Sequence, residues 1–364
     1  MFGRTFRVAT IAGVPVHVDS SWLWIAAFIT YSLWLRFQAV AGGAVRGLAF
    51  AVVTASLFFG AVLLHELAHA LAARAQRIPV FGITLVIFGG FTSARSDARG
   101  PGPAFVIAAV GPATSLALGG LFWGLSRVLE ASNPALAVAF GSVGWVNLFM
   151  AAFNVLPGLP LDGGRMLQAA VWRFSGRSDL GTRVAARGGT AVAALLVAGA
   201  ILEVTRQDLV AALWLAIIGS FIYRGSRDAE RSARAAARLA TGRVADVLAP
   251  PPQVVPADIT LSEALDRFLR GHEGLAFPVA DGGRIVGLVS FSSAREIGVE
   301  DPLRPVRDAL IPLDEVVVLH PDDPLDAVTP RLVDGRLALV LRDGELVGTV
   351  SGERVLAWAS APRG

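Results

Sequence analysis

The sequence predicts a polytopic α-helical membrane protein with about six transmembrane helices and a membrane-associated β-hairpin, followed by a cytoplasmic α/β region. Three observations lead to this fold class. Of the 364 residues, 54% are hydrophobic and only 17% are charged, which is too few charges for an ordinary soluble protein. Up to about Tyr223, the apolar segments are long enough to cross roughly 30 Å of hydrocarbon. Beyond Arg243, short alternating strands and polar helices are expected instead.

Six apolar segments are the expected transmembrane helices. They lie at about residues 20–40, 47–74, 102–127, 134–157, 186–204 and 208–224. The first follows Pro15 and Asp19 and ends without a small-residue cleavage pattern. It is therefore interpreted as a retained span and not as a cleaved signal peptide.

The arginines predict how the chain is oriented, since it has no lysine and a net charge of +3. No basic stripe is interleaved with aromatic residues, so no nucleic-acid partner is expected. With a cytoplasmic N-terminus, the inner side holds Arg4, Arg7, Arg74, Arg77, Arg95, Arg99, Arg165, Arg173, Arg177, Arg183, Arg187, Arg224 and Arg227. The outer side holds only Arg36, Arg46, Arg127 and Arg206. This asymmetry predicts a multi-pass protein of the cell membrane with its N-terminus and C-terminal region in the cytoplasm.

The segment Ile78–Arg95 between the second and third spans is apolar and β-branched, but Gly82, Gly89 and Gly90 interrupt it. This pattern predicts a hairpin of short strands. Non-helical backbone at membrane depth requires protein or a wet cavity to satisfy its amides, so the hairpin is expected to line such a cavity. An ordinary cytoplasmic loop hairpin remains the alternative.

Polar side chains interrupt the second span in LLHELAHALAAR, Leu63–Arg74. His65 and His69 are one helical turn apart, so both imidazoles can reach one ion, and Glu66 lies beside them. This H-E-x-x-H pattern lets two imidazoles hold Zn²⁺ while a carboxylate deprotonates a water molecule. With no cysteine in the chain, thiol chemistry is excluded. A structural role for these groups is disfavoured, because unpaired polar groups are costly in hydrocarbon.

Asp162 is the best candidate for a third ligand. It lies in NVLPGLPLDGG, Asn154–Gly164, at the inner end of the fourth expected span. The prolines and glycines of this segment interrupt the helix and let a carboxylate turn toward a cavity. An aspartate in a surface turn is the alternative. His65, His69 and Asp162 with one water would form a four-coordinate site.

The motifs HELAH and NVLPGLPLDGGR resemble those of the site-2 protease family of intramembrane zinc metalloproteases, in content, order and placement. The resemblance implies one catalytic zinc ion held by His65, His69 and Asp162, with Glu66 as the general base.

Further roles follow from the same resemblance. Asn154 matches the motif asparagine that binds the substrate backbone or the developing oxyanion. Asn147 shares that task or forms a helix-packing hydrogen bond, and the two alternatives stay open. Gly89 and Gly90 lie in a hairpin that resembles the membrane-associated strands of the family, which would pair with an unwound substrate helix.

Two other features near the spans have weaker interpretations. His17 precedes the first span and is interpreted as an interfacial residue beside Asp19 and Trp22, with a fourth-ligand or gating role as the alternative. The small residues of Ala108–Gly120 predict close helix packing, and the Gly111–Pro112 step is expected to kink the third span near the site.

An internal repeat follows Arg243. The stretch from Val244 to Ser290 is echoed from Val306 to Ser351, a period of about 60 residues. The pattern resembles a pair of CBS modules, a regulatory fold that often binds adenine nucleotides. The ribose-binding aspartate of that family is replaced by Ser293 in one copy and Arg354 in the other. These replacements argue against an adenine nucleotide, and dimerisation or protein sensing stays open as the other role.

These features divide the chain into four parts. They are a transmembrane zinc metalloprotease domain at 1–224, a basic linker helix at 225–242, a first CBS module at 243–300 and a second at 301–364. The linker helix is either solvated or in contact with anionic lipid heads.

The resulting hypothesis is an intramembrane zinc endopeptidase acting in regulated proteolysis, with the lipid bilayer as its environment. The substrate expected from the resemblance is a membrane-spanning protein, such as an anti-sigma factor or a membrane-tethered transcription-factor precursor. The CBS pair would regulate cleavage or form a homodimer. The alternative is a CBS-gated channel or transporter, which does not account for Glu66 beside two helical histidines.

Overall fold

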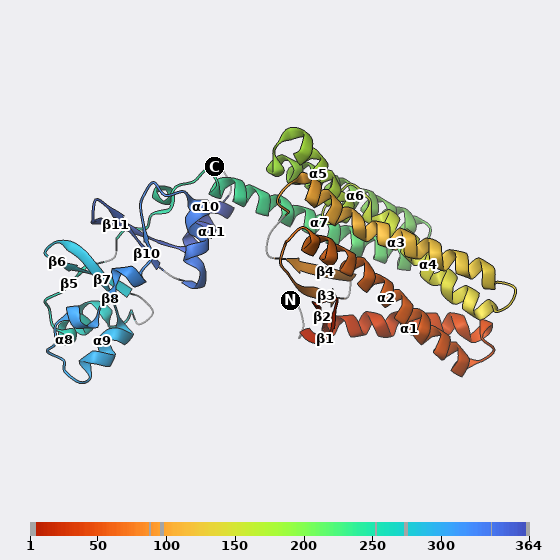
Figure 1. Ribbon diagram of the computed structural model, residues 1–364, viewed down its shortest axis with the longest axis horizontal. Coiled ribbons are helices and arrows are strands. Elements are labelled where there is room, and N and C mark those ends of the chain that lie inside the picture. The colour runs from red at the N-terminus through yellow and green to blue at the C-terminus, as the bar shows by residue number, and fades with distance from the viewer. Residues whose placement is uncertain are drawn as a thin grey trace. The chain divides into compact units, whose positions relative to one another are not determined.

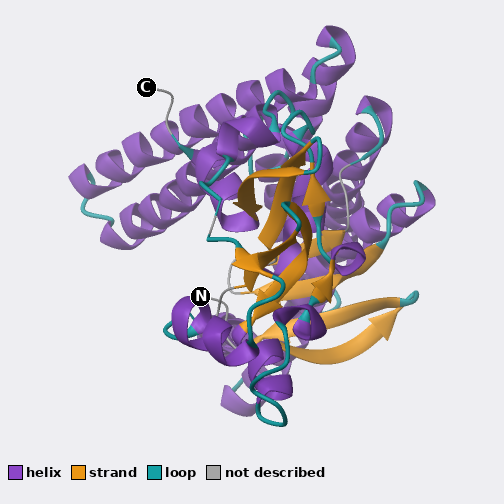
Figure 2. Cartoon of the chain, turned by 90° about the vertical axis from the view of Figure 1, so that its left-hand side faces the viewer, coloured by secondary structure: helices purple, strands orange, loops and turns teal. Residues whose placement is uncertain are grey.

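The computed structural model describes residues 5–86, 89–94, 98–251, 253–272, 276–335 and 337–361. Arg4 and Arg95, which entered the orientation argument, lie outside these residues. The chain divides into two compact units, Met1–Glu230 and Arg231–Gly364. Long helices dominate the first unit, and short strands and helices alternate in the second (Figures 1 and 2).

Six helices of the described residues are long and apolar enough to cross a membrane. They are α1 (Ser20–Val40), α2 (Ala44–Ala75), α3 (Pro101–Leu129), α4 (Pro134–Asn154), α6 (Ser178–Thr205) and α7 (Leu209–Leu239). The expected helical membrane fold is confirmed. Two helices are longer than expected, because α6 begins at Ser178 and α7 continues through most of the basic segment 225–242 without a break.

A shorter helix, α5 (Asp162–Ser175), was missed by the sequence analysis. Pro157 and Pro160 lie in the non-helical segment between α4 and α5, where they cannot donate backbone hydrogen bonds to continue α4. Gly176 ends α5 in the left-handed conformation at φ +71°. The polar residues at its start made this helix look like part of a loop.

A four-stranded sheet of the first unit has the order β1 (Thr5–Ile11), β2 (Val14–Asp19), β3 (Val80–Val86) and β4 (Gly89–Ala94). The expected hairpin is β3–β4, although Ile87, Phe88 and Arg95 lie outside the described residues. β2 pairs with β3 in parallel and the other neighbours are antiparallel. The first two strands were not predicted, although the alternation of Val14, Val16 and Val18 after a turn at Ala12–Gly13 was a readable strand signal.

The sheet packs against α2 close to the H-E-x-x-H segment. Leu67 and Ala70 of α2 form a buried cluster with Ile83 and Leu85 of β3 and with Val14. The apolar face of the sheet is therefore set beside the helix that carries the two histidines.

Small residues bring α3 and α4 into close contact, as the composition of Ala108–Gly120 predicts. A Cβ on Gly119 would lie 2.8 Å from Leu148 Cδ2, and one on Gly144 would lie 2.7 Å from the Trp123 backbone nitrogen. Larger side chains at these positions would force the two helices apart.

The second unit contains two sheets. One has the order β5 (Val255–Pro256), β6 (Ala276–Asp281), β7 (Arg284–Ser290) and β8 (Ile311–Pro312), and the other has the order β11 (Glu345–Ser351), β10 (Leu337–Arg342) and β9 (Val318–Leu319). Its α-helices are α8 (Leu261–Ala264), α9 (Phe291–Gly298), α10 (Leu325–Val328) and α11 (Gly352–Ser360), and further helical turns of other types lie at Val244–Val247, Leu265–Leu269, Val306–Ala309, Leu313–Glu315 and Thr329–Gly335. The alternation in both copies confirms the expected α/β pair.

The two repeats exchange their leading segments. Val244 and Val247, which begin the first repeat, are buried in the core of the second repeat beside Leu325. Val306 and Ala309, which begin the second, are buried in the core of the first. Each core is therefore completed by the other repeat, a feature that the sequence period does not reveal. The predicted boundary between the two CBS modules, at residues 300 and 301, stays a prediction about the sequence repeats. The two hydrophobic cores do not divide there, because each contains residues from both repeats.

Candidate active site

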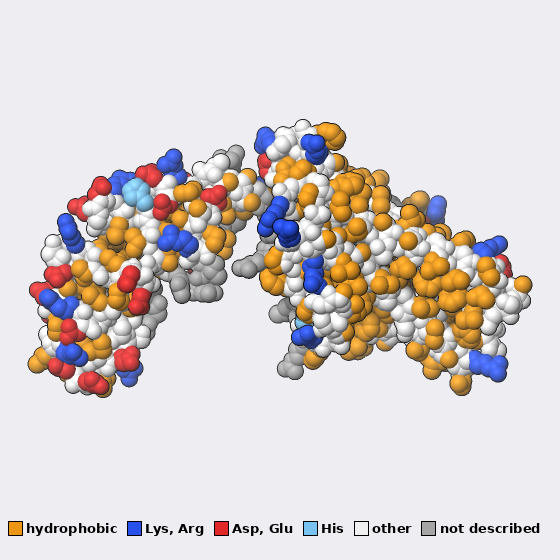
Figure 3. All heavy atoms as spheres, in the orientation of Figure 1, with side chains coloured by type: hydrophobic (Ala, Val, Ile, Leu, Met, Phe, Trp, Pro, Cys, Tyr) orange, Lys and Arg blue, Asp and Glu red, His pale blue; other side chains and the backbone are white. Residues whose placement is uncertain are grey.

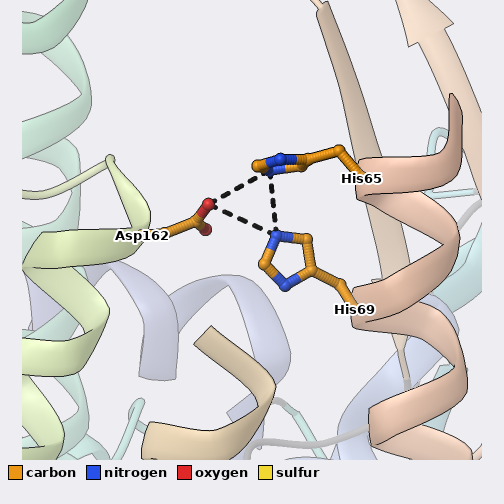
Figure 4. Close-up of side chains that lie close together, drawn as sticks. All are labelled: His65, His69 and Asp162. Atoms are coloured by element: carbon orange, nitrogen blue, oxygen red, sulfur yellow. Dashed lines mark hydrogen bonds and ion pairs between the residues drawn. The ribbon is translucent and has the colours of Figure 1, made fainter. Parts of the chain in front are cut away.

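Three predicted ligands converge between α2 and the start of α5 (Figure 4). His65 Nε2 lies 3.2 Å and His69 Nε2 lies 3.3 Å from Asp162 Oδ2. The two Nε2 atoms are 3.2 Å apart. All three ligand atoms lie within 4.8 Å of one another, the arrangement of a site that could hold a metal ion.

The outer nitrogen of each imidazole has its own partner on α3. His69 Nδ1 is 2.6 Å from the Ile107 carbonyl oxygen, and His65 Nδ1 is 2.8 Å from Ser115 Oγ. Because a carbonyl only accepts, the Nδ1 of His69 carries the proton and its Nε2 turns a lone pair toward the centre. The Ser115 hydroxyl can accept from His65 in the same way. The two histidines and the carboxylate thus fit Zn²⁺ in donor type, number and orientation.

Gly111 leaves room for this arrangement. A Cβ at this position would lie 2.2 Å from His69 Nε2 and 2.7 Å from His65 Nε2, so any other residue would displace the rings. Ile107, Gly111 and Ser115 follow one another at intervals of four residues and so share one face of α3. Gly111 was predicted to allow close helix packing and a kink, and Ser115 was not predicted as a site residue, although this spacing was a readable signal.

The segment before Asp162 is held by α6 and α7. The backbone N–H of Leu159 donates to the Ala185 carbonyl at 3.0 Å, and the buried Ser226 hydroxyl donates to the Leu159 carbonyl at 2.6 Å. A Cβ on Gly189 would lie 2.0 Å from the same carbonyl oxygen. Hydrogen bonds and close contacts with two helices therefore set the position of the predicted third ligand.

Asp162 is an anion in this setting. Burial by itself would raise the pKa of the Asp162 carboxyl, but hydrogen bonds donated by His65 and His69, whose Nε2 atoms carry protons when no ion takes their lone pairs, outweigh burial and hold that pKa well below its ordinary range. Its position in the first turn of α5 adds a favourable interaction with the helix dipole.

The side chain of Glu66 extends from α2 toward β4. The Thr92 hydroxyl lies 3.1 Å from Glu66 Oε2, and a Cβ on Gly90 would lie 2.7 Å from Glu66 Cγ. The predicted general base is thus adjacent in sequence to one ligand and in contact with the strand that contains Gly89 and Gly90.

The other predicted site residues lie outside the group of three ligands. Asn147 is fully buried, and its Nδ2 donates to the Val143 carbonyl of its own helix at 2.8 Å. Its Oδ1 accepts no hydrogen bond from any residue that the structure describes. Asn154 is the last residue of α4. His17 lies on β2 against Gly82, where a Cβ would be 3.2 Å from its Nδ1. The functional roles of these three residues stay predictions.

The fold and the site define a polytopic membrane metalloprotease joined to a CBS pair. The model described as Peptidase family M50 matches residues 53–140 and 130–198, and the CBS domain model matches residues 244–299 and 306–360. The chain is 37% identical over 356 residues to "Putative zinc metalloprotease Rip3" of Mycobacterium tuberculosis, covering 94% of this chain and 89% of that protein. The chain therefore belongs to peptidase family M50.

Two further proteins are similar to the chain at lower sequence identity. The chain is 29% identical over 367 residues to a Synechocystis protein with the same description, sll0528, covering 97% and 95% of the two chains. A solved structure, the site-2 protease from Methanocaldococcus jannaschii, aligns with a TM-score of 0.45 and 21% identity, covering 62% of this chain and 95% of that one. The expected zinc metalloprotease is confirmed by the family match and the curated relatives, which favours the enzyme over the channel or transporter.

Proposed function

We propose that this protein is an intramembrane zinc endopeptidase in which His65, His69 and Asp162 hold the ion and Glu66 is the general base. The convergence of three ligand atoms within 4.8 Å, on and beside a membrane-spanning helix, is the observation that carries this proposal. When bound, zinc supplies Lewis acidity that polarises the scissile carbonyl and acidifies water.

The side chains of the site divide the remaining work. Glu66 accepts a proton from the attacking water and delivers it to the leaving amide nitrogen. Ser115 and the Ile107 carbonyl keep the two imidazoles in the orientation that ligation needs. Asn154 would donate to the substrate carbonyl or the developing oxyanion, and Asn147 would share that task unless its hydrogen bond to the Val143 carbonyl is its whole role.

The substrate in this proposal is a membrane-spanning protein whose helix unwinds before cleavage. β4 is at one edge of the four-stranded sheet, so an extended segment can add to it as a further strand. Gly89 and Gly90 are part of this edge, and the general base touches the same strand. Examples of such a substrate are an anti-sigma factor and a membrane-tethered transcription-factor precursor.

The orientation places the N-terminus and the CBS pair in the cytoplasm, according to the arginine distribution. His65 precedes Arg74 by nine residues, which is about 14 Å along a helix, so cleavage would occur in the inner half of the bilayer. The product released into the cytoplasm would be the signalling fragment.

Regulation by the CBS pair through dimerisation or protein sensing is favoured over an adenine nucleotide. The Arg354 guanidinium donates to the backbone carbonyls of Val247 and Leu248 at 2.8 and 3.0 Å. Ser293 is used in a capping box with Ser290 at the start of α9. Both replacements of the nucleotide-binding aspartate thus have structural partners of their own.

The decisive experiment compares the wild type with Glu66→Gln and Asp162→Ala after purification in detergent. We expect Glu66→Gln to retain zinc and to lose cleavage of a membrane-spanning peptide by about 1000-fold, because the carboxylate is the only proposed base. Asp162→Ala is expected to weaken zinc affinity by about tenfold or more.

Asp179→Ala is the matched control, since Asp179 is a partly exposed aspartate in the first turn of α6, paired with Arg177 and Arg183. This variant should keep both zinc and cleavage. Wild-type cleavage by Glu66→Gln would refute the assigned base, and wild-type zinc content in Asp162→Ala would remove that residue from the ligands.

A further inference from the structure

We propose that Thr92 positions Glu66, so that the strand β4 supports the general base as well as offering an edge to the substrate. This inference rests on the proposed function of Glu66. Thr92 is a positioning residue in this scheme, since it acts on the carboxylate and not on the substrate.

The register of the sheet aims Thr92 at α2. Thr92 lies opposite Ile83 and Gly90 lies opposite Leu85 in the antiparallel β3–β4 pair. Ile83 and Leu85 are buried against α2 in the cluster described above. Directly opposite residues project to the same face of a sheet, so Gly90 and Thr92 also face α2.

Gly90 allows the strand to approach the glutamate. A Cβ at Gly90 would lie 2.7 Å from Glu66 Cγ and 3.2 Å from Glu66 Cδ. Its absence lets the backbone of β4 pack directly on the stem of Glu66. The strand then confines the aliphatic part of the Glu66 side chain on one side. This packing reduces the number of rotamers that the side chain can adopt.

The Thr92 hydroxyl completes this confinement. Thr92 Oγ1 is 3.1 Å from Glu66 Oε2 and 3.2 Å from the Glu66 backbone carbonyl oxygen, and its single hydrogen can serve only one of them. The carboxylate is the stronger acceptor because it is charged, and the carbonyl already accepts from the next turn of the helix. The hydroxyl therefore donates to Oε2, and Oε1 is the oxygen that would take a proton from water.

This contact links two parts of the reaction. A substrate segment that adds to the edge of β4 would lie on the same strand that holds the carboxylate through Thr92. Because Thr92 acts on the base and not on the substrate, it should affect the chemical step more than binding.

The test compares Thr92→Val, which keeps the shape without the hydroxyl, with Thr92→Ser, which keeps the hydroxyl. Thr84→Val is the matched control, because Thr84 alternates with Ile83 and Leu85 and so faces away from α2. Each full-length variant is assayed for zinc content, for affinity for a peptide hydroxamate, and for kcat and KM with a synthetic transmembrane peptide of about 20 apolar residues.

Thr92→Val should lower kcat about tenfold and change KM by less than about twofold, because it removes one hydrogen bond to a charged group. Hydroxamate affinity should also fall, since this chelator hydrogen-bonds the carboxylate beside the ion. Zinc content should match the wild type, and Thr92→Ser and Thr84→Val should behave like the wild type.

Wild-type kcat in Thr92→Val would overturn the inference, as would a Thr92→Ser variant as impaired as Thr92→Val. Loss of zinc in Thr92→Val would also overturn it, because the residue would then support the metal site and not the base. Glu66→Gln distinguishes a failure of the role proposed for Thr92 from a failure of the role proposed for Glu66. If Glu66→Gln is inactive while Thr92→Val is normal, only the role of Thr92 fails. If Glu66→Gln is active, the proposed base itself fails.

Discussion

The two units of this chain solve opposite packing problems. In the membrane unit large apolar side chains face outward, as with Trp24 at 78% exposed and Leu195 at 74%, while glycines and several buried polar side chains lie inside. In the CBS unit the large aliphatic side chains are inside, and Leu261 and Leu325 are fully buried. Figure 3 shows hydrophobic side chains over much of the membrane unit and charged ones spread over the CBS unit.

This difference teaches what holds each unit together. In lipid, apolar burial offers little driving force between helices, so close backbone approach and hydrogen bonds carry the packing. In water, the burial of Leu and Val supplies most of the stability. The same kind of substitution should therefore have effects of different size in the two units.

The largest effect is expected from Gly111→Ala in the membrane unit. The added methyl group would lie 2.2 Å from His69 Nε2, so both imidazoles must move. We expect cleavage to fall at least about 1000-fold, since zinc retention and the geometry of attack both depend on these rings. Zinc analysis and a cleavage assay test this. Gly120→Ala on the same helix is the control, because a Cβ there meets nothing within 4 Å, and equal damage in both variants would reject the explanation.

A cavity in the CBS unit should give the next largest effect. Leu325→Ala removes a fully buried side chain and should lower the free energy of unfolding of this unit by about 2–5 kcal/mol, with zinc content unchanged. Chemical denaturation followed by circular dichroism measures the change. Leu195→Ala, on the outward face of α6, should change stability by less than about 0.5 kcal/mol. Comparable destabilisation in the two variants would contradict the contrast between the units.

The smallest effect is expected from Ser226→Ala. The substitution removes the hydroxyl that donates to the Leu159 carbonyl, three residues before Asp162. Zinc affinity should fall about threefold to tenfold, because a buried carbonyl loses its partner and the ligand-bearing segment loosens. Competition with a zinc chelator measures this change. Ser220→Ala, an exposed serine of the same helix, is the control, and a normal affinity in Ser226→Ala would show that α6 alone holds the segment.

Much of the site was predictable because its signals are local. His65, Glu66 and His69 are brought together by one helical turn, and the prolines and glycines around Asp162 mark a break in the chain. The interval of four residues that aligns Gly111 with Ser115 was equally visible, but nothing in it indicates which helix that face meets. The strands β1 and β2 were missed because their short alternating pattern directly precedes a long apolar span and was interpreted as the segment flanking that span.

The sequence by itself determined the membrane unit, the α/β pair and the H-E-x-x-H helix, and it predicted Asp162 as the third member of the group that could hold a metal ion. These predictions follow from composition and from the periodicity and spacing of residues that are close together in the sequence. Only the tertiary structure decided that Gly111 makes room for two imidazoles, that Thr92 reaches Glu66, and that the CBS repeats exchange their leading segments. Such contacts join residues that lie far apart in sequence, and the distance between two side chains depends on the packing of whole helices and strands.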